Sequence, residues 1–327
     1  MPTLLDAVAA EPAAPWLISI IERIGPAAAA AVPGLVAALR GADAKPAAAA
    51  AAALGKTGVT SPEVIAALTE GLSETRDALV RVAAARALEA LGDTGHAAAE
   101  ALRASLSAAP PEVRLAFAKA LWKLRGAAGE LVPVLAELMA GAQPRLREAA
   151  IQALAEFGPA AGAAAPRLRE LMGASDRSAQ LAAAALWKIE RTPEAVSALC
   201  RMLAEESGSE AGGWDLGRLL AEIGPPAQPA LPELERAIGR GRSWAVAPFL
   251  CLAADRDEVL RVLTEAAREN PDDGTRARAI EELGKLGPAA AAAAPVVERA
   301  LRGRSANLRR AAEQALPWLR QAPAEAA

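Results

Sequence analysis

The chain has 327 residues, with 36 Lys and Arg against 39 Asp and Glu and a formal net charge of −3. This near balance excludes a strong overall attraction to nucleic acid or to anionic membranes. Hydrophobic residues make up 53% of the chain, yet aromatic residues make up only 3% and tyrosine is absent. Alanine, the best helix former, is prominent among them. A core of such small side chains favours an elongated helical stack over a globule.

The N-terminal stretch MPTLLDAVAAEPAAPW lacks the basic region with which a secretory signal peptide begins. No apolar run reaches the roughly 20 residues that span a bilayer, because Pro33, Lys45, Pro46 and Pro295 interrupt the alanine-rich stretches. We therefore expect a soluble, cytoplasmic protein that does not bind membranes.

Self-similarity along the chain predicts the architecture. Helical segments recur that end in an apolar residue followed by Gly or a close substitute. The final apolar position falls at Ile24, Thr57, Leu91, Leu124, Phe157, Ile189, Ile223, Asp255, Leu286 and Leu319. Successive positions lie 31 to 34 residues apart, and Asp255 is placed by this spacing rather than by its chemistry.

Each repeat contains two helical patterns, and no strand-type alternation appears. The second pattern is clearest at Val80–Gly92, where apolar residues recur with the period of an amphipathic helix. Glycines suited to a left-handed cap after the second helix occur at Gly25, Gly58, Gly92, Gly158, Gly224 and Gly287. Prolines suited to the next first turn follow at Pro26, Pro159, Pro225 and Pro288. Prolines expected inside the first helix, where they would bend it, occur at Pro33, Pro133, Pro166, Pro232 and Pro295.

The string Gly-Pro-Ala-Ala, then Pro-x-Leu, then Val-Arg-x-x-Ala-Ala-x-Ala-Leu-x-x-Leu-Gly resembles the short HEAT-like repeats first described in bilin lyases. It stands here at Gly158–Pro159, Pro166–Leu168 and Val80–Gly92, and similar strings cover nearly the whole chain. The landmarks of ankyrin and tetratricopeptide repeats are absent. The resemblance implies an all-α fold, a right-handed α-solenoid of about ten stacked antiparallel helix pairs. It implies little about function, because such repeats are general-purpose scaffolds.

One arginine position of the second helix also follows the resemblance. It is occupied by Arg81, Arg114, Arg147, Arg276 and Arg309. In HEAT proteins this position forms a ladder between neighbouring repeats, so the resemblance implies a structural role, with Asp77, Glu112 and Asp273 as nearby acidic partners. Ala179 and Gly213 occupy it in two middle repeats, where the ladder should be interrupted.

Few residues point to chemistry. A His–Cys zinc site, a multi-histidine iron centre and a Ser-His-Asp triad each need partners that a chain with the single histidine His96 lacks. No phosphate-binding loop or dinucleotide fingerprint occurs. Cys200 and Cys251 lie in apolar helical segments, and we expect buried thiols. We therefore expect no enzyme activity, no catalytic residues, no metal site and no cofactor.

Tryptophan placement suggests a binding surface. The second, sixth and ninth positions after the leading apolar residue point outward on each second helix, and the resemblance places them in the concave groove. Large apolar side chains facing water often mark interfaces. The predicted site for a protein or peptide partner consists of Leu115, Lys119, Trp122, Trp187, Trp214 and Arg218.

An alternative is that Trp122 and Trp187 pack against neighbouring helices. Small residues hold the ninth position in other repeats, namely Gly55, Ala155, Ala221 and Gly284, and they indicate close approach of a helix there. The remaining tryptophans, Trp16, Trp244 and Trp318, are expected in the core or at end caps.

We expect a protein-interaction scaffold whose oligomeric state the sequence leaves open. A first alternative is a nucleic-acid-binding or DNA-glycosylase-like HEAT protein that uses the basic C-terminal repeats, densest in charge at Arg302, Arg304, Arg309 and Arg310. A second is a cofactor chaperone of the bilin-lyase type. Residues 1–327 should form one solenoid, with a flexible point at 205–214 where glycines interrupt the helical pattern.

Overall fold

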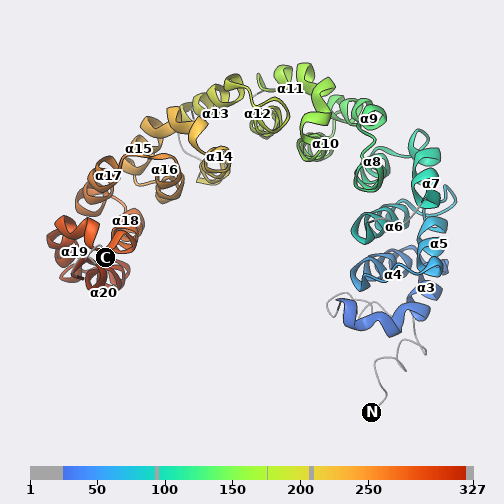
Figure 1. The fold of residues 1–327 in the computed structure, drawn as a ribbon, viewed down its shortest axis with the longest axis horizontal. Helices are drawn as coiled ribbons and strands as arrows, with labels where there is room; N and C mark the ends of the chain where they lie inside the picture. The colour runs from blue at the N-terminus through green and yellow to red at the C-terminus, as the bar shows by residue number, and fades with distance from the viewer. Residues whose placement is uncertain (1–24, 93–95, 175, 206–209, 322–327) are drawn as a thin grey trace, which may run out of the picture. The chain divides into compact units, whose positions relative to one another are not determined.

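A computed structural model describes residues 25–92, 96–174, 176–205 and 210–321. These residues form α-helices and short 3-10 helices, and none of them lies in a strand. Contacts divide the chain into two compact units, Met1–Glu190 (unit 1) and Arg191–Ala327 (unit 2). Each unit is a stack of antiparallel helix pairs (Figure 1), so the predicted all-α solenoid is confirmed.

In unit 1 the first helices of the pairs form one layer and the second helices form another (Figure 1). The first-helix layer contains η1 (Gly25–Ala31) with α3 (Val32–Arg40), α5 (Pro62–Glu70), α7 (His96–Leu106), α9 (Ala128–Ala140), and η2 (Gly158–Ala164) with α11 (Ala165–Leu171). The second-helix layer contains α4 (Ala44–Thr57), α6 (Ala78–Leu91), α8 (Pro111–Arg125), α10 (Pro144–Phe157) and α12 (Arg177–Glu190).

Unit 2 repeats the same arrangement. Its first helices are α13 (Pro193–Glu205), η3 (Pro225–Ala230) with α15 (Leu231–Gly239), α17 (Arg256–Glu269), and η5 (Gly287–Ala293) with α19 (Ala294–Leu301). Its second helices are α14 (Glu210–Ile223), η4 (Ser243–Ala245) with α16 (Val246–Leu252), α18 (Asp273–Leu286) and α20 (Ala306–Leu319).

The repeat period located the ends of the second helices. Helices end at the predicted residue at Thr57, Leu91, Phe157, Ile223, Leu286 and Leu319. Both α8 and α12 extend one residue beyond it. The prediction at Asp255 is wrong, because α16 ends at Leu252 and Asp255 is the N-cap of α17. Its carboxylate accepts a hydrogen bond from the Asp257 N–H at 2.9 Å, the usual role of aspartate at this position.

The prolines expected to bend the first helices mostly begin them instead. Each Gly-Pro segment forms a 3-10 turn, and the α-helix then starts at the residue before the second proline. Pro33, Pro166, Pro232 and Pro295 therefore lie in the first turn, where a missing N–H leaves no helical hydrogen bond unmade. Pro133 lies inside α9, as predicted.

The glycines after the second helices adopt backbone angles that other residues avoid. Positive φ angles occur at Gly58, Gly92, Gly158, Gly224 and Gly287, as predicted. Gly58 is left-handed helical, whereas Gly158 has φ 58° and ψ −138°, in a region that side chains with a Cβ rarely enter. The glycine thus turns the chain from a second helix into the next 3-10 segment.

Replacing Gly158 by alanine is expected to lower the free energy of unfolding by about 1–3 kcal/mol, because the added Cβ is strained at this φ. Gly162→Ala is the matched control, since Gly162 lies in the same η2 segment, outside the left-handed φ range, and has open space at its Cβ position. Chemical denaturation compares the two variants. Equal stability would contradict the conformational explanation.

Second helices of adjacent repeats approach each other through small residues. A Cβ built on Gly55 of α4 would lie 2.8 Å from the Cα of Ala87 in α6, and one on Gly284 of α18 would lie 2.8 Å from the Cα of Ala315 in α20. These distances leave no room for a side chain. The ninth position is therefore a helix contact in these two pairs.

The repeated arginine ties the two helices of its own repeat together. Its guanidinium donates to a backbone carbonyl at or just beyond the end of the first helix, in the pairs Arg81–Leu72 (3.2 Å), Arg147–Gly141 (3.0 Å), Arg276–Ala267 (3.3 Å) and Arg309–Gly303 (2.9 Å). Carbonyls at a helix C-terminus lack helical partners, so these arginines satisfy groups that would otherwise need water.

In unit 1 the same arginines also reach the next repeat. The Arg81 guanidinium lies 5.3 Å from the ring centroid of Phe117. Arg114 pairs with Glu137 at 2.6 Å, and Arg147 pairs with Asp176 at 3.4 Å. Glu112, the partner suggested by the sequence for Arg114, forms none of the ion pairs seen among the described residues, whereas Asp273 does pair with Arg276 at 3.3 Å.

Surface ion pairs join neighbouring first helices. They are Arg40–Glu70 at 2.9 Å, Arg103–Glu130 at 2.8 Å and Arg261–Glu235 at 2.9 Å. The hydrogen bond from the arginine lowers the pKa of both Glu70 and Glu130 below the ordinary glutamate value. Because these carboxylates are largely open to solvent, the pairs favour one register of the helices more than they stabilise the fold.

The boundary between the units lies upstream of the flexible point predicted at 205–214. Arg191, the first residue of unit 2, has a φ of 56° and is the one described non-glycine residue with a positive φ. Residues 206–209 of the predicted flexible point lie outside the described residues, and α14 begins at Glu210. Among the described helices, none is both long and apolar enough to cross a membrane.

Candidate functional site

Three of the four predicted site residues of unit 1 lie on α8, and they are only partly exposed. Leu115 and Lys119 are half-buried, and Lys119 pairs with Glu156 of α10 at 3.3 Å. The indole of Trp122 stacks on Phe157 with the ring centroids 4.2 Å apart and the planes inclined by 23°. Trp122 therefore fills the ninth-position contact between α8 and α10 that Gly55 fills between α4 and α6.

Trp187 differs from the predicted exposed stripe. It lies on α12 with an exposed fraction of 8%, and the adjacent Ala184 has the same value. The helical wheel gave the direction of Trp187 from its own helix axis, but it did not include the neighbouring elements that cover it. This tryptophan is positioned for packing.

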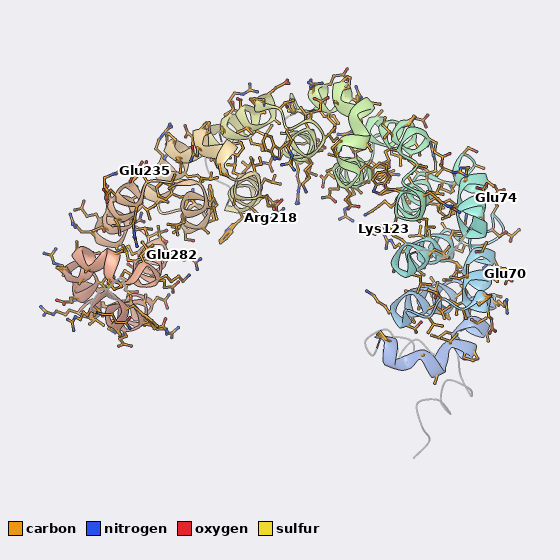
Figure 2. All side chains as sticks on the ribbon, viewed as in Figure 1. Glu70, Glu74, Lys123, Arg218, Glu235 and Glu282 are labelled. Carbon is orange, nitrogen blue, oxygen red and sulfur yellow. The ribbon has the colours of Figure 1, made fainter. Side chains whose placement is uncertain are left out.

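Trp214 and Arg218 are the predicted residues that are open to solvent. Trp214 is 56% exposed in the first half of α14. Arg218, one turn further, pairs with Glu222 at 2.6 Å and lies 4.0 Å from Asp215. Figure 2 shows Arg218 on the second-helix layer of unit 2 and Glu235 on the first-helix layer. An exposed indole beside a guanidinium is a composition enriched at protein-binding surfaces.

The other tryptophans of unit 2 divide between core and surface. Trp244 is 5% exposed, and its ring occupies the space beside Gly213 and Gly217 of α14, where any Cβ would collide with it or with Pro248. The core position predicted for Trp244 is confirmed. Trp318, expected in the core or at an end cap, lies outside the core on α20, the last of the described helices, and is 57% exposed.

Trp318 stands at the wall of a cleft between α18 and α20. The cleft has a volume of about 610 Å³ and is lined by Glu281, Gly284, Lys285, Gln314, Ala315 and Trp318. The close contact of Gly284 with Ala315 forms its floor. Next to this lining on α18, the nearly buried Glu282 accepts a hydrogen bond from Lys285 at 2.9 Å and pairs with Arg278 at 3.0 Å. Sequence reasoning missed this cleft, although the small residue Gly284 at the ninth position had indicated that a helix approaches closely there.

The end of unit 2 beside this cleft is basic. Residues 294–321 contain six Arg and two Glu. Arg320 pairs with Glu298 at 2.6 Å, and Arg309 folds back onto the carbonyls of Gly303 and Arg304. Side chains that are exposed and form no ion pair within the described chain remain at Arg299, Arg302, Arg304, Arg310 and Glu313.

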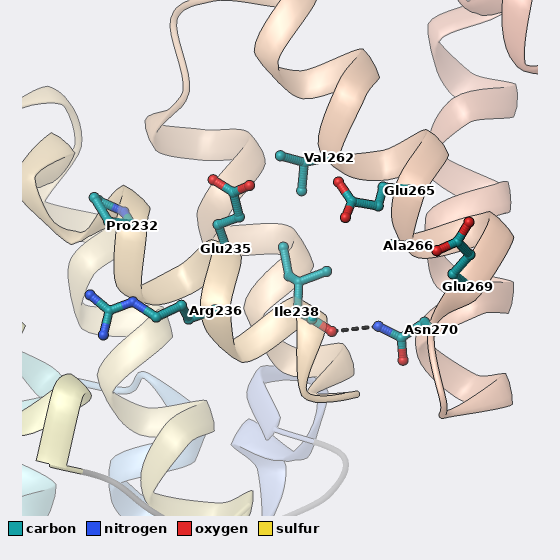
Figure 3. A pocket seen from close by; sticks show the side chains of 10 residues that line it. Pro232, Glu235, Arg236, Ile238, Val262, Glu265, Ala266, Glu269 and Asn270 are labelled. Carbon is teal, nitrogen blue, oxygen red and sulfur yellow. Dashed lines mark hydrogen bonds between the residues drawn. The ribbon is translucent and has the colours of Figure 1, made fainter.

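A second cleft lies on the first-helix layer, between α15 and α17 (Figure 3). Its volume is about 540 Å³. Asn270 at one end is buried and donates to the Ile238 carbonyl at 2.5 Å, which joins the ends of the two helices. The carboxylates of Glu235 and Glu265 both face Arg261, at 2.9 and 3.7 Å. These contacts hold neighbouring repeats together, and both carboxylates are occupied by ion pairs with Arg261.

The described residues hold no group of His, Cys, Asp and Glu side chains arranged for a metal ion. The predicted burial of both thiols is wrong in part, because Cys200 is half-buried and Cys251 is exposed. Burial raises the pKa of the Cys200 thiol, so it is a poor nucleophile. α7 begins at His96, whose side chain lies outside the described residues.

Comparison with known sequences identifies the repeat. The family of HEAT repeats matches residues 32–122 and 131–214, together more than half of the chain. No curated protein sequence matches the chain.

Similar folds occur among solved structures. Kap95p, whose binding induces the switch loops of RanGDP to adopt the GTP-bound conformation, is 12% identical with a TM-score of 0.56, over 89% of this chain and 45% of Kap95p. Kap121p bound to Nup53p is 13% identical with a TM-score of 0.50, over 93% of this chain and 38% of Kap121p. The CpcE–CpcF complex of phycocyanin lyase from Nostoc sp. PCC7120 is 24% identical with a TM-score of 0.45, over 71% of this chain and 92% of that chain. At these identities the likeness concerns the fold alone.

Proposed function

The chain belongs to the HEAT-repeat family, and from this premise we propose that it is a non-catalytic scaffold that binds a protein or peptide on its second-helix layer. The observation that carries the proposal is the exposure of Trp214, at 56% of its surface, on a second helix of unit 2. Leaving an indole in water is unfavourable unless a partner covers it.

The surroundings of Trp214 suit a protein partner. Arg218 stands one turn away on the same face of α14, where it pairs with Glu222 and lies 4.0 Å from Asp215. Trp and Arg are the residues most enriched among interface hot spots. On α8 of unit 1, Leu115 and Lys119 offer a second, shallower contact region, whereas Trp122 and Trp187 serve packing in this proposal.

Proteins of similar fold bind other proteins, which supports the proposed class of partner. Kap121p has been crystallised bound to Nup53p. A stack of helix pairs exposes a long surface that is rigid along each helix, and such surfaces are the common binding sites of solenoids.

The proposal is tested by comparing partner capture by the wild-type chain and by Trp214→Ala. The variant should retain the wild-type melting temperature, because the removed indole is exposed, and should lose about thirtyfold in affinity for the captured partner. Leu79→Ala is the matched control, since Leu79 is 57% exposed on a second helix of unit 1.

Quantitative mass spectrometry of the captured proteins, followed by titration of the purified partner, gives the result. Capture that is equally strong with Trp214→Ala would remove Trp214 from the binding surface. If the wild-type chain enriches no protein over an unrelated helical control, the scaffold proposal itself is wrong.

A further inference from the structure

The α18–α20 cleft combines an apolar wall with a small-residue floor. Trp318 exposes 57% of its surface, and the floor consists of Gly284 and Ala315. Its volume of about 610 Å³ is in the range of sites that hold a large side chain or a small ligand. An apolar side chain entering here would cover the Trp318 ring and displace water from the glycine–alanine floor.

One face of α20 connects this apolar cleft to positive charge. Arg310, Gln314 and Trp318 are spaced by four residues, so they lie along one side of the helix. The rise of an α-helix separates Arg310 from Trp318 by about 12 Å along the axis. Arg302 and Arg304 lie in the loop that leads into the same end of α20.

The free charge at this end is mostly positive. Among the described residues, the exposed side chains here that form no ion pair are those of four arginines and one glutamate, Arg299, Arg302, Arg304, Arg310 and Glu313, whereas Glu298 is paired with Arg320. Arg309 is half-buried, and its guanidinium donates to the backbone carbonyls of Gly303 and Arg304. Carboxylates of a partner would find charge-assisted hydrogen-bond donors here.

From this arrangement we infer that the α18–α20 cleft binds an acidic protein segment, with an apolar side chain against Trp318 and carboxylates on Arg304 and Arg310. The inference rests on the proposed scaffold function and names the partner chemistry for its last two repeats. An extended segment covers the separation of about 12 Å in about four residues, which sets the spacing between the apolar residue and the acidic block.

A nucleic acid fits the same surface less well. Phosphodiester backbones bind along continuous positive tracks, whereas Glu281 lines the α18 side of the cleft. Lys285, the basic residue of the lining, and Arg278 on the same helix are both paired with Glu282. Positive charge is therefore confined to one end of the cleft, which matches a short acidic block.

The test uses the full-length chain and a fluorescent synthetic peptide that carries one leucine and a block of glutamates about four residues beyond it. Comparison probes replace the glutamates by lysines, replace the leucine by serine, or substitute an oligothymidine of equal charge. Fluorescence anisotropy at two salt concentrations measures the dissociation constants, and thermal melting of each variant verifies the fold.

Trp318→Ala should lower the affinity for the leucine–glutamate peptide by about thirtyfold. The wild-type chain should bind the serine peptide with the same low affinity, because the side chain that covers Trp318 is then missing from the peptide. Arg304→Gln with Arg310→Gln should weaken binding by at least about tenfold and flatten its salt dependence. The matched controls are Leu79→Ala and the double variant Arg256→Gln with Arg268→Gln, since both arginines are exposed on α17.

Several results would overturn the inference. They are absence of acidic-peptide binding below about 1 mM, equal binding of the lysine peptide, and equal loss in the control variants. If oligothymidine binds more tightly than the leucine–glutamate peptide, and Trp318→Ala does not change its affinity, this end is a nucleic-acid-binding surface instead. If a partner is captured through Trp214 while no acidic peptide binds, the inference fails and the scaffold function stands.

Discussion

Trp244→Ala is expected to lower the free energy of unfolding of unit 2 by about 3–5 kcal/mol. The indole is 5% exposed and lies against Gly213 and Gly217. Because neither glycine has a side chain that could move into the cavity, the cavity should remain open, and the loss should fall in the upper part of that range. Hydrogen exchange of the α14 and α16 amides, together with chemical denaturation, measures the effect.

The internal control for this prediction is Gly213→Ala, whose effect on stability should have opposite signs in the wild-type and Trp244→Ala backgrounds. A Cβ on Gly213 would lie 2.3 Å from ring atoms of Trp244, so Gly213→Ala should destabilise the wild-type chain. In the Trp244→Ala background the same substitution should stabilise the chain, because the added methyl group enters the cavity and alanine favours the helix. Trp318→Ala, which truncates an exposed indole, should leave the melting temperature unchanged. Destabilisation by Gly213→Ala in both backgrounds would contradict the described contact.

Phe117→Ala is expected to lower the free energy of unfolding of unit 1 by about 3–5 kcal/mol. The ring is fully buried in α8, and the guanidinium of Arg81 lies 5.3 Å from its centroid. Arg81 is itself 5% exposed and donates to the Leu72 carbonyl. Removal of the ring therefore opens a cavity and takes away the aromatic face on which a buried cation rests. Chemical denaturation of the variant measures the loss.

A double-mutant cycle separates these two contributions. Combining Phe117→Ala with Arg81→Met should give a coupling energy of about 0.5–2 kcal/mol, the magnitude of a cation–π contact away from water. Phe249→Ala is the comparison, because Phe249 is equally buried but lies in unit 2. Its coupling to Arg81→Met should be zero. A zero coupling for Phe117 as well would show that the ring acts by volume alone.

The helix pairs could be predicted because the residues that start and end their helices act locally. Glycine after a second helix and proline at the next first turn act through the φ of one residue or the loss of one N–H. The period of these signals located helix ends such as Leu91 and Leu286. It failed at Asp255, where the spacing pointed to a helix end but the carboxylate caps the following helix. The preference of aspartate for the N-cap position was the available signal, but the prediction followed the repeat spacing instead.

The exposure of the tryptophans could not be predicted in the same way. A helical wheel gives a direction from one helix axis, whereas burial depends on what the neighbouring helix carries. Trp122 is covered because Phe157 ends α10, and an aromatic residue at that repeat position was a visible sign of the contact. Trp318 is 57% exposed on α20, beside the small residues Gly284 and Ala315. The side chains that the neighbouring helix carries, rather than the local pattern, distinguish the two outcomes.

The residue at the ninth position also sets how each stack responds to force. At Gly55 and Gly284 adjacent second helices meet at backbone distance, so sliding one past the other is opposed by atoms that cannot yield. Between α8 and α10 the contact is a pair of stacked rings, Trp122 on Phe157, which can shift in their planes at small energetic cost. Stretching unit 1 should therefore lengthen the α8–α10 joint before the α4–α6 joint. A single side chain at this position thus tunes the local elasticity of the array.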